Sequence, residues 1–150
     1  MNYSTSNELA HFVFTDAVIG EIESTKAVFN VYMDNVTILP ENSCNRDIRT
    51  MRANEFTLKI LTPTLEEVMK EGFKKYNADG VLTETVDDVV VAPEEYKEIF
   101  EGMRGATIYS IENKDGRYIF SVDADDGCYV ITVSGSADRE EWDRFLVKEM

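Results

Sequence analysis

Residues 117–133 read R-Y-I-F-S-V-D-A-D-D-G-C-Y-V-I-T-V, in which two alternating segments flank an acidic turn. Alternate positions on both sides of the turn carry apolar or aromatic residues: Tyr118, Phe120, Val122, Tyr129, Ile131 and Val133. Successive side chains of a strand point to opposite faces of a sheet, so this alternation predicts two strands. The stretch therefore predicts an antiparallel hairpin whose connection is A-D-D-G, residues 124–127.

The acidic turn has some features of a calcium loop, but its spacing is wrong. An EF-hand loop has glycine at its sixth position and a bidentate glutamate at its twelfth. Counted from Asp123, the glycine is fifth and the twelfth residue is Ser134. The one histidine and two cysteines of the chain are also widely scattered. We therefore expect no metal site.

The neighbouring segments extend the hairpin into a meander. I-Y-S-I, residues 108–111, reads as a strand, and Asp115-Gly116 is the pair that accepts the positive φ angles of a tight turn. Further upstream, alternation predicts strands at 11–22, 26–39, 56–60 and 81–91, with a loop at 40–47. The first two would form one long hairpin.

Helical spacing appears in three places. Thr64 and Glu67 have capping-box spacing, and apolar residues recur at helical intervals up to Tyr76. A second helix is expected to begin at Pro93 and to end before Gly105. Asp138 is expected to cap a third, closing helix, on which Trp142, Phe145 and Leu146 share a face.

Together these elements predict an α+β domain with a mainly antiparallel sheet. We expect a meander, partly curled barrel or sandwich of about seven strands, with two or three short helices. The chain of 150 residues reads as one globular domain, 1–150, in which residues 1–10 form a flexible N-terminus.

Charge is the most unusual bulk property of the chain. Its 29 acidic and 15 basic residues give a net charge of −14, which disfavours nucleic acid and anionic membranes and attracts basic proteins. The sequence has neither an apolar membrane-spanning run nor a secretory signal, so we expect a cytoplasmic protein. It has neither a dinucleotide-binding nor a P-loop motif, so we expect no cofactor. Cys44 and Cys128 are expected to be reduced thiols.

Two short segments carry a family resemblance. F-T-D-A-V-I-G-E-I, residues 14–22, and E-W-D-R-F, residues 141–145, resemble the two ends of small uncharacterised bacterial domains that open F-[HT]-D-[AS]-x-I. Some of these domains are associated with immunity proteins of polymorphic toxin systems. The resemblance implies a β-rich, non-enzymatic cytoplasmic protein. Thr15 stands where many of those sequences have histidine, and no active site is implied.

Three functions follow as hypotheses. The first is an acidic, immunity-type binding protein for a basic protein, whose contact residues would be Asp79, Asp87, Asp88, Glu94 and Glu95. The second is a binder of small apolar ligands, and the residues proposed for its pocket are Phe14, Asp16, Tyr32, Tyr118 and Tyr129. The third and least supported is a hydrolase that uses a carboxylate pair.

Asp16 falls on the apolar side of its predicted strand. Strict alternation from Phe12 and Phe14 to Val18 points the Asp16 carboxylate toward the core. Either the strand ends or bulges at this residue, or the carboxylate is buried with a hydrogen-bonding partner.

Overall fold

The computed structural model describes residues 2–46 and 48–147. These residues form sixteen strands, one α-helix and two short 3-10 helices. The class of the fold is therefore mainly β, and the expectation of an α+β domain with about seven strands and two or three helices is wrong. Asp47, the last residue of the predicted loop, lies outside the described residues.

Ten of the strands form one antiparallel sheet. Their bounds are Tyr3–Ser6 (β1), Val18–Ser24 (β3), Phe29–Asp34 (β4), Phe56–Leu61 (β7), Thr64–Lys70 (β8), Val89–Val90 (β11), Thr107–Lys114 (β12), Arg117–Ala124 (β13), Gly127–Ser134 (β14) and Ala137–Trp142 (β15). The strands are ordered β1-β15-β7-β4-β3-β12-β13-β14-β8-β11. β1 and β11 are therefore the edges of this sheet.

The remaining elements form two smaller sheets and the helices. Phe12–Val13 (β2), Val36–Ile38 (β5), Met51–Ala53 (β6) and Leu146–Val147 (β16) make a four-stranded sheet. Phe73–Tyr76 (β9) and Leu82–Val86 (β10) form a separate two-stranded sheet. The helices are Leu9–His11 (η1), Pro93–Glu95 (η2) and Tyr96–Gly102 (α1).

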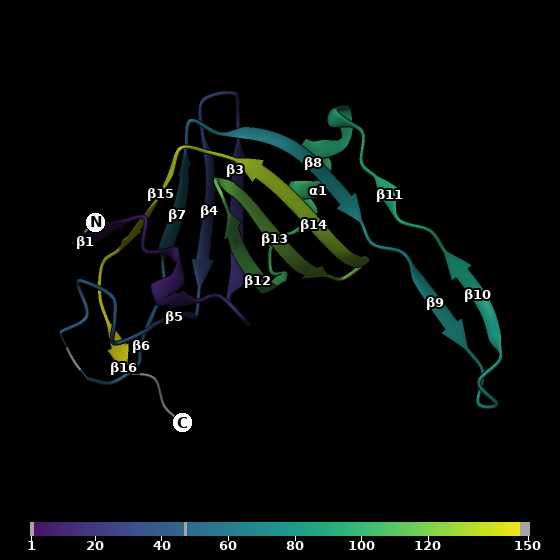
Figure 1. Ribbon diagram of the computed structural model, residues 1–150, viewed down its shortest axis with the longest axis horizontal. Coiled ribbons are helices and arrows are strands. Elements are labelled where there is room, and N and C mark those ends of the chain that lie inside the picture. Colours follow the sequence, from purple (N-terminus) through teal and green to yellow (C-terminus); the bar gives the residue numbers. More distant parts are fainter. Residues whose placement is uncertain (1, 47, 148–150) are drawn as a thin grey trace.

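The main sheet curls back on itself around an aromatic core (Figure 1). The rings of Phe29 on β4 and Phe120 on β13 lie 5.5 Å apart, although β3 and β12 separate their strands. In a flat sheet these strands would lie about 14 Å apart, at about 4.8 Å per strand. Phe100 of α1 also contacts Phe29, at 6.2 Å. The contacts show that the two halves of the sheet and the helix share one core.

A second aromatic cluster lies where β15 and β7 meet the small sheet. Trp142 is fully buried and stacks on Phe56 at 5.7 Å, while Phe12 contacts both rings edge-on. Phe14 completes the cluster at 5.9 Å from Phe56. Burial of each large apolar side chain contributes about 1.5–3 kcal/mol, so this cluster anchors the C-terminal part of the chain.

Several predicted elements are confirmed. β12, β13 and β14 form the meander, and Asp115 and Gly116 have positive φ angles of 54° and 85° in its first turn. The predicted hairpin of the N-terminal third is β3–β4, the strand at 56–60 is β7, and the helix that begins at Pro93 is η2 followed by α1. Turn chemistry and alternation identified the strands correctly, and Pro93 identified the start of the helix.

The helix expected at 64–76 is instead β8 followed by β9. Leu65 pairs with Val133 and Val68 pairs with Ile131, so a β-bulge places both on the inner face although they are three residues apart. A bulge inserts one extra residue into one strand of a pair. The apparent helical spacing of Leu65 and Val68 therefore comes from the bulge.

The expectation of a helix at 138–146 is also wrong, because this segment contains β15 and the start of β16. The buried residues of β15 are Asp138, Glu140 and Trp142, which alternate along the strand. Two of these inward positions carry carboxyl groups, so the apolar pattern of a strand is hidden in the sequence. β1 and β7 flank β15 and fix its conformation.

Three other segments differ in detail from the expectation. The predicted strand at 11–22 is divided into β2 and β3, the one at 26–39 into β4 and β5, and the one at 81–91 into β10 and β11. Asp16 lies in the first of these breaks with a φ of 70°, exposed to solvent, so the strand ends there and the carboxylate is not buried. Within the segment 1–10, for which flexibility was expected, Tyr3–Ser6 pairs with β15 as an edge strand.

Candidate protein-binding surface

A two-stranded arm projects from the body of the protein at the β8–β11 edge (Figure 1). β9 continues the chain from β8, and β10 leads into β11, so the arm extends a ribbon that begins in the main sheet. Every residue from 73 to 90 is exposed. An isolated two-stranded hairpin is at best marginally stable in water, because it has no core of its own.

Large apolar side chains are concentrated on the arm and at its base. Those with high exposure are Phe73, Tyr76, Val81, Leu82, Val86, Val89 and Val90, and Val90 is 63% exposed. Its charged residues from 73 to 86 are two lysines, one aspartate and one glutamate, which balance. The arm is therefore a neutral, apolar feature of a strongly acidic protein. Exposed apolar groups gathered in this way mark interaction sites.

The two faces of the arm differ. Phe73 pairs across the ribbon with Val86, and Lys75 pairs with Glu84 through an ion pair of 3.4 Å. The Lys75 ammonium also lies 5.4 Å from the centroid of the Phe73 ring, so these side chains share one face. The next cross-strand pair, Tyr76 and Leu82, lies at the end of β9 nearest the turn. Both side chains of this pair are largely exposed to solvent.

The base of the arm is a close crossing of two backbone segments. A Cβ atom added to Gly72 would lie 1.9 Å from the Val86 carbonyl oxygen and 2.6 Å from the Asp87 carbonyl carbon. The Gly72 N–H donates to Asp88 Oδ1 at 2.6 Å. Only glycine fits this crossing, because any side chain would overlap backbone atoms that cannot move independently.

The tip of the arm is closed by an asparagine. Asn77 Oδ1 accepts hydrogen bonds from the backbone N–H groups of Asp79 and Val81, at 2.9 and 3.0 Å. Gly80 has a φ of 79° and donates its own N–H to the Asn77 carbonyl oxygen. Such side-chain to backbone bonds stabilise a turn locally, without a contact to the rest of the protein.

A cavity of about 400 Å³ lies where the arm leaves the body. Phe73, Val86 and Val89 form apolar parts of its wall, and the β13–β14 turn forms the other side with Asp126 and Gly127. We call this cavity the notch. Glu71, immediately before the arm, donates its N–H to the Cys128 carbonyl oxygen at 2.8 Å, so the ribbon diverges from β14 directly after this bond.

The acidic side of the notch is held by Asp126. Tyr129 Oη donates to Asp126 Oδ2 at 2.7 Å, and Lys70 Nζ lies 3.5 Å from the same oxygen. The Tyr129 hydroxyl is the main cause that lowers the pKa of Asp126, and Lys70 adds to it. Burial and the Asp126 carboxylate raise the pKa of Tyr129 to about 12. Asp126 is therefore ionised at neutral pH, and the contacts with Tyr129 and Lys70 hold its side chain in place.

The acids expected to contact a partner do not form one cluster. Asp79 lies in the turn at the tip of the arm, Asp87 and Asp88 lie at its base, and Glu94 and Glu95 lie on η2. Figure 1 shows that the tip is far from η2 and α1. All five residues are exposed. The structure therefore brings Asp87 and Asp88 beside the notch and separates Asp79 from Glu94 and Glu95.

The residues proposed to line an aromatic ligand pocket are mostly in the core. Phe14, Tyr118 and Tyr129 are buried, Tyr32 is half-buried with its hydroxyl 3.4 Å from Glu23, and Asp16 is exposed. None of the four cavities described for this structure is lined by any of these five residues. Their aromatic rings pack against protein.

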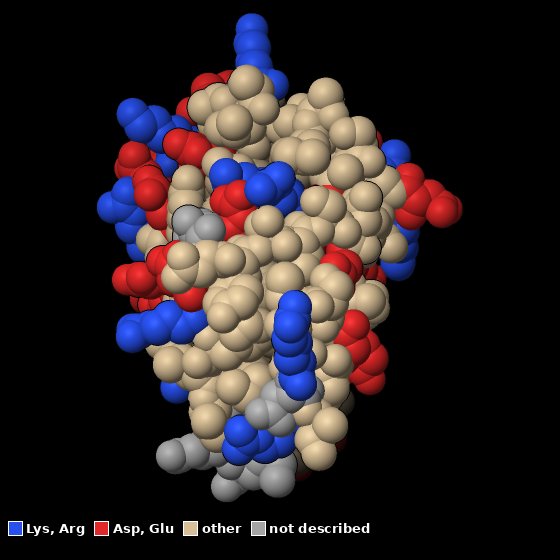
Figure 2. Space-filling view, turned by 90° about the vertical axis from the view of Figure 1, so that its left-hand side faces the viewer, with Lys and Arg blue, Asp and Glu red and all other residues tan. Residues whose placement is uncertain are grey.

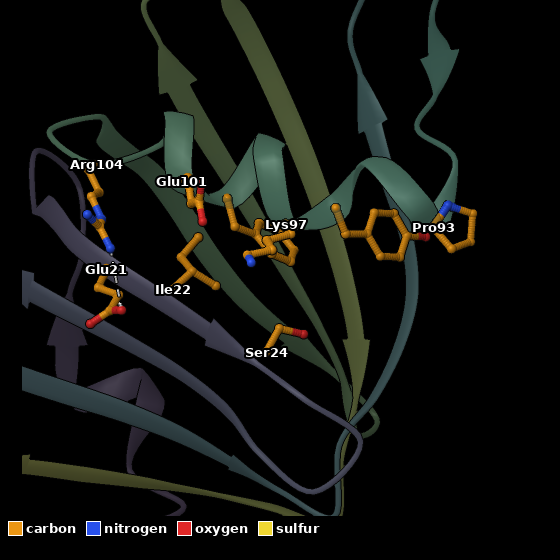
Figure 3. A pocket seen from close by; sticks show the side chains of 9 residues that line it. Glu21, Ile22, Ser24, Pro93, Lys97, Glu101 and Arg104 are labelled. Atoms are coloured by element: carbon orange, nitrogen blue, oxygen red, sulfur yellow. Dashed lines mark ion pairs between the residues drawn. The ribbon is translucent and has the colours of Figure 1, made fainter.

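A second cavity, of about 440 Å³, lies between α1 and β3 (Figure 3). Arg104 and Glu21 face each other across one end at 3.6 Å, and Lys97 and Glu101 project from the helix. Ile22 lies beneath them on β3. Two basic and two acidic residues line the cavity, so it has no concentration of one charge for a ligand.

A buried acidic pair on β15 was missed by sequence analysis. Tyr118 Oη donates to Asp138 Oδ2 at 2.7 Å, and Thr5 Oγ1 donates to Glu140 Oε1 at 2.7 Å. Burial is the main cause that raises the pKa of Glu140 to about 9, and Asp138 raises it further. Glu140 is therefore protonated at neutral pH beside Asp138. Neither carboxyl lines any of the four cavities.

The histidine and the cysteines have separate partners. His11 Nδ1 lies 2.9 Å from Glu8 Oε1, and Cys44 Sγ donates to the Ser4 carbonyl oxygen at 3.7 Å. Both Cys44 and Cys128 are free thiols. Within residues 2–46 and 48–147, no group of three or more His, Cys, Asp or Glu side chains could hold a metal ion.

Figure 2 shows the side of the protein that carries β1, β15 and β16. Uncharged residues cover most of this side, Lys and Arg side chains also lie near its centre, and charges of both signs are interspersed around its margins. Interspersed charges of both signs produce a weaker field than charges of one sign. This side therefore offers a basic partner less attraction than the net charge of the chain suggests.

No family model, curated protein or solved structure matches this chain. In the part of the chain that the structure describes, no helix is long and apolar enough to cross a membrane.

Proposed function

We propose that this protein is a non-catalytic, acidic binding protein whose arm contacts a basic protein partner. The exposed apolar side chains of β9 and β10 carry this proposal, because they project from the body where a partner can bury them. A few well-buried side chains, aromatic ones above all, supply most of the free energy of protein association. The arm supplies such anchors with its backbone shape already formed.

Charge supports a basic partner. The net charge is −14, and the carboxylates of Asp87, Asp88 and Glu71 lie at the base of the arm. Opposite charges at an interface accelerate encounter and select partners, while apolar anchors hold the complex. An immunity-type role in the cytoplasm, in which the protein covers a basic toxin, belongs to this class and agrees with the resemblance of residues 14–22 and 141–145.

Paired variants in an affinity capture test the proposal. The first replaces Tyr76, Val81 and Leu82 by serine, which removes apolar groups from the outer arm without touching the core. The matched control is Tyr109→Ser on β12, because Tyr109 is 72% exposed and lies in the main sheet. We expect the wild type and the control to retain one basic protein, and the triple variant to lose it.

The salt concentration is the second variable in the same experiment. Exposed charges are screened over about 8 Å at physiological ionic strength, so raising the salt concentration should slow association. Retention that is independent of both the arm residues and the salt concentration would contradict the proposal.

A further inference from the structure

We propose that the notch receives one apolar side chain of the partner, flanked in the partner's sequence by lysine or arginine. This inference rests on the proposed function and names the part of the surface that selects the partner. Its basis is the combination of apolar walls and acidic rim at the place where the arm leaves the sheet.

The size and walls of the notch suit a single side chain. Its volume is about 400 Å³, near the lower end of the range of about 300–1,000 Å³ for pockets that bind small molecules. Phe73 and Val86 face each other across the ribbon and are 48% and 37% exposed. The Lys75–Glu84 ion pair follows them along the same face and ends the apolar strip. The apolar area therefore has room for one anchor.

The acidic rim of the notch favours positively charged residues next to the partner's apolar side chain. Glu71, Asp87 and Asp126 line the notch together with one base, Lys70. Lys70 is already paired with Asp126 and lies 5.8 Å from the centroid of the Tyr129 ring. The remaining carboxylates, Glu71 and Asp87, form no ion pair within the described part of the chain and can meet basic groups of the partner. An acidic partner segment would instead place like charges together.

The walls of the notch are fixed before binding. The Gly72 N–H bond to Asp88 holds the arm side, and the Tyr129 hydroxyl bond to Asp126 holds the turn side. A pocket that is already formed loses less conformational entropy when it is filled. The notch is thus a suitable place for the most buried residue of an interface.

Three blocked tripeptides test this inference by amide NMR titration of the full chain. We expect acetyl-Arg-Phe-Arg-amide to shift the amide signals of Phe73, Gly127 and Cys128. Acetyl-Arg-Ala-Arg-amide lacks the anchor and acetyl-Glu-Phe-Glu-amide reverses the charge, so each should bind at least about tenfold more weakly. Equal shifts with all three peptides, or no shift at the notch with the first, would overturn the inference.

Two matched substitutions on the arm locate the effect. Val86→Lys places a charge on the wall of the notch, whereas Val81→Lys makes the same change near the tip. Only Val86→Lys should abolish the shifts. Partner capture then separates the two proposals. Capture that needs the outer arm but tolerates Val86→Lys would refute the notch and keep the proposed function, whereas capture independent of the arm would refute both.

Discussion

The backbone N–H of Gly72 donates a hydrogen bond of 2.6 Å to Asp88 Oδ1 at the place where the two-stranded ribbon leaves the main sheet. Gly72 lies between β8 and β9, and Asp88 lies between β10 and β11, so the bond joins the two chain segments at the base of the arm. This bond and the close crossing of Gly72 with Val86 hold the arm relative to the body. The arm's direction therefore depends on a few residues at its base.

Gly72→Ala should release the arm while the body stays folded. The new methyl group would overlap the Val86 carbonyl oxygen, so the crossing must open. Hydrogen exchange should show loss of protection for the amides of β9 and β10, with little change in β13 and β14.

Gly102→Ala is the control for that variant, because an added Cβ there meets nothing within 4 Å. Alanine is a better helix former than glycine by up to about 1 kcal/mol, so this control should be neutral or slightly stabilising. Unchanged protection of β9 and β10 in Gly72→Ala would show that the crossing does not hold the arm.

Asp88→Ala should weaken the same junction through the lost acceptor. Asp88 is exposed, so we expect only local loosening of the arm, seen as faster exchange of the Gly72 amide. Asp88→Asn retains a side-chain carbonyl oxygen and should restore much of the protection. Equal exchange in both variants would mean that the charge of Asp88, and not its hydrogen bond, acts at the junction.

Tyr118→Phe should destabilise the whole protein. It removes the donor to Asp138 Oδ2 in the core, and a buried polar group left without its partner costs about 1–3 kcal/mol. The free energy of unfolding, measured in urea, reports the loss. Tyr109→Phe removes a hydroxyl from an exposed ring and should change stability by less than about 0.5 kcal/mol. Equal stability of the two variants would contradict the buried hydrogen bond.

The buried acidic pair should make the protein less stable as pH rises. Burial and Asp138 raise the pKa of Glu140 from 4.5 to about 9, so between these values the folded state holds a proton that the unfolded state has lost. Stability from this group is complete below pH 4.5 and falls as pH rises toward about 9.

Glu140→Gln isolates this effect. Glutamine keeps a side-chain oxygen for Thr5 but has no proton to lose in this range. Unfolding in urea at pH 5 and pH 8 should show a larger loss of stability for the wild type than for the variant. Parallel losses would mean that other groups cause the pH dependence.

The sequence predicted those parts of the fold in which local chemistry and tertiary structure agree. Asp115-Gly116 specifies a tight turn, and the strands on either side alternate without interruption, so the β12–β14 meander was predicted correctly. The prediction was wrong for β8, β9, β15 and β16, where tertiary contacts override the local pattern. The bulge between Leu65 and Val68 gives these residues a helical spacing in the sequence. The inward carboxyl groups of Asp138 and Glu140 interrupt the apolar alternation that predicts a strand.

The candidate site was predicted only through its charge. Asp87 and Asp88 were expected to face a partner, and they lie at the base of the arm. The apolar anchors were not expected, because Tyr76 was assigned to a helix and Leu82 to a strand with an unspecified apolar face. Periodicity shows that such residues share a face, but not whether another part of the chain covers that face. Their exposure became visible only in the folded arrangement.

The most direct test of the arm as the partner-binding surface is site-specific photo-crosslinking in cells that express the protein natively. A photoreactive phenylalanine analogue replaces Tyr76 on the arm in one variant and Tyr109 on β12 in the other, and both positions are exposed. We predict a crosslink to one basic protein from position 76 and none to that protein from position 109. The same yield from both positions, or a crosslink from position 109 alone, would contradict the account.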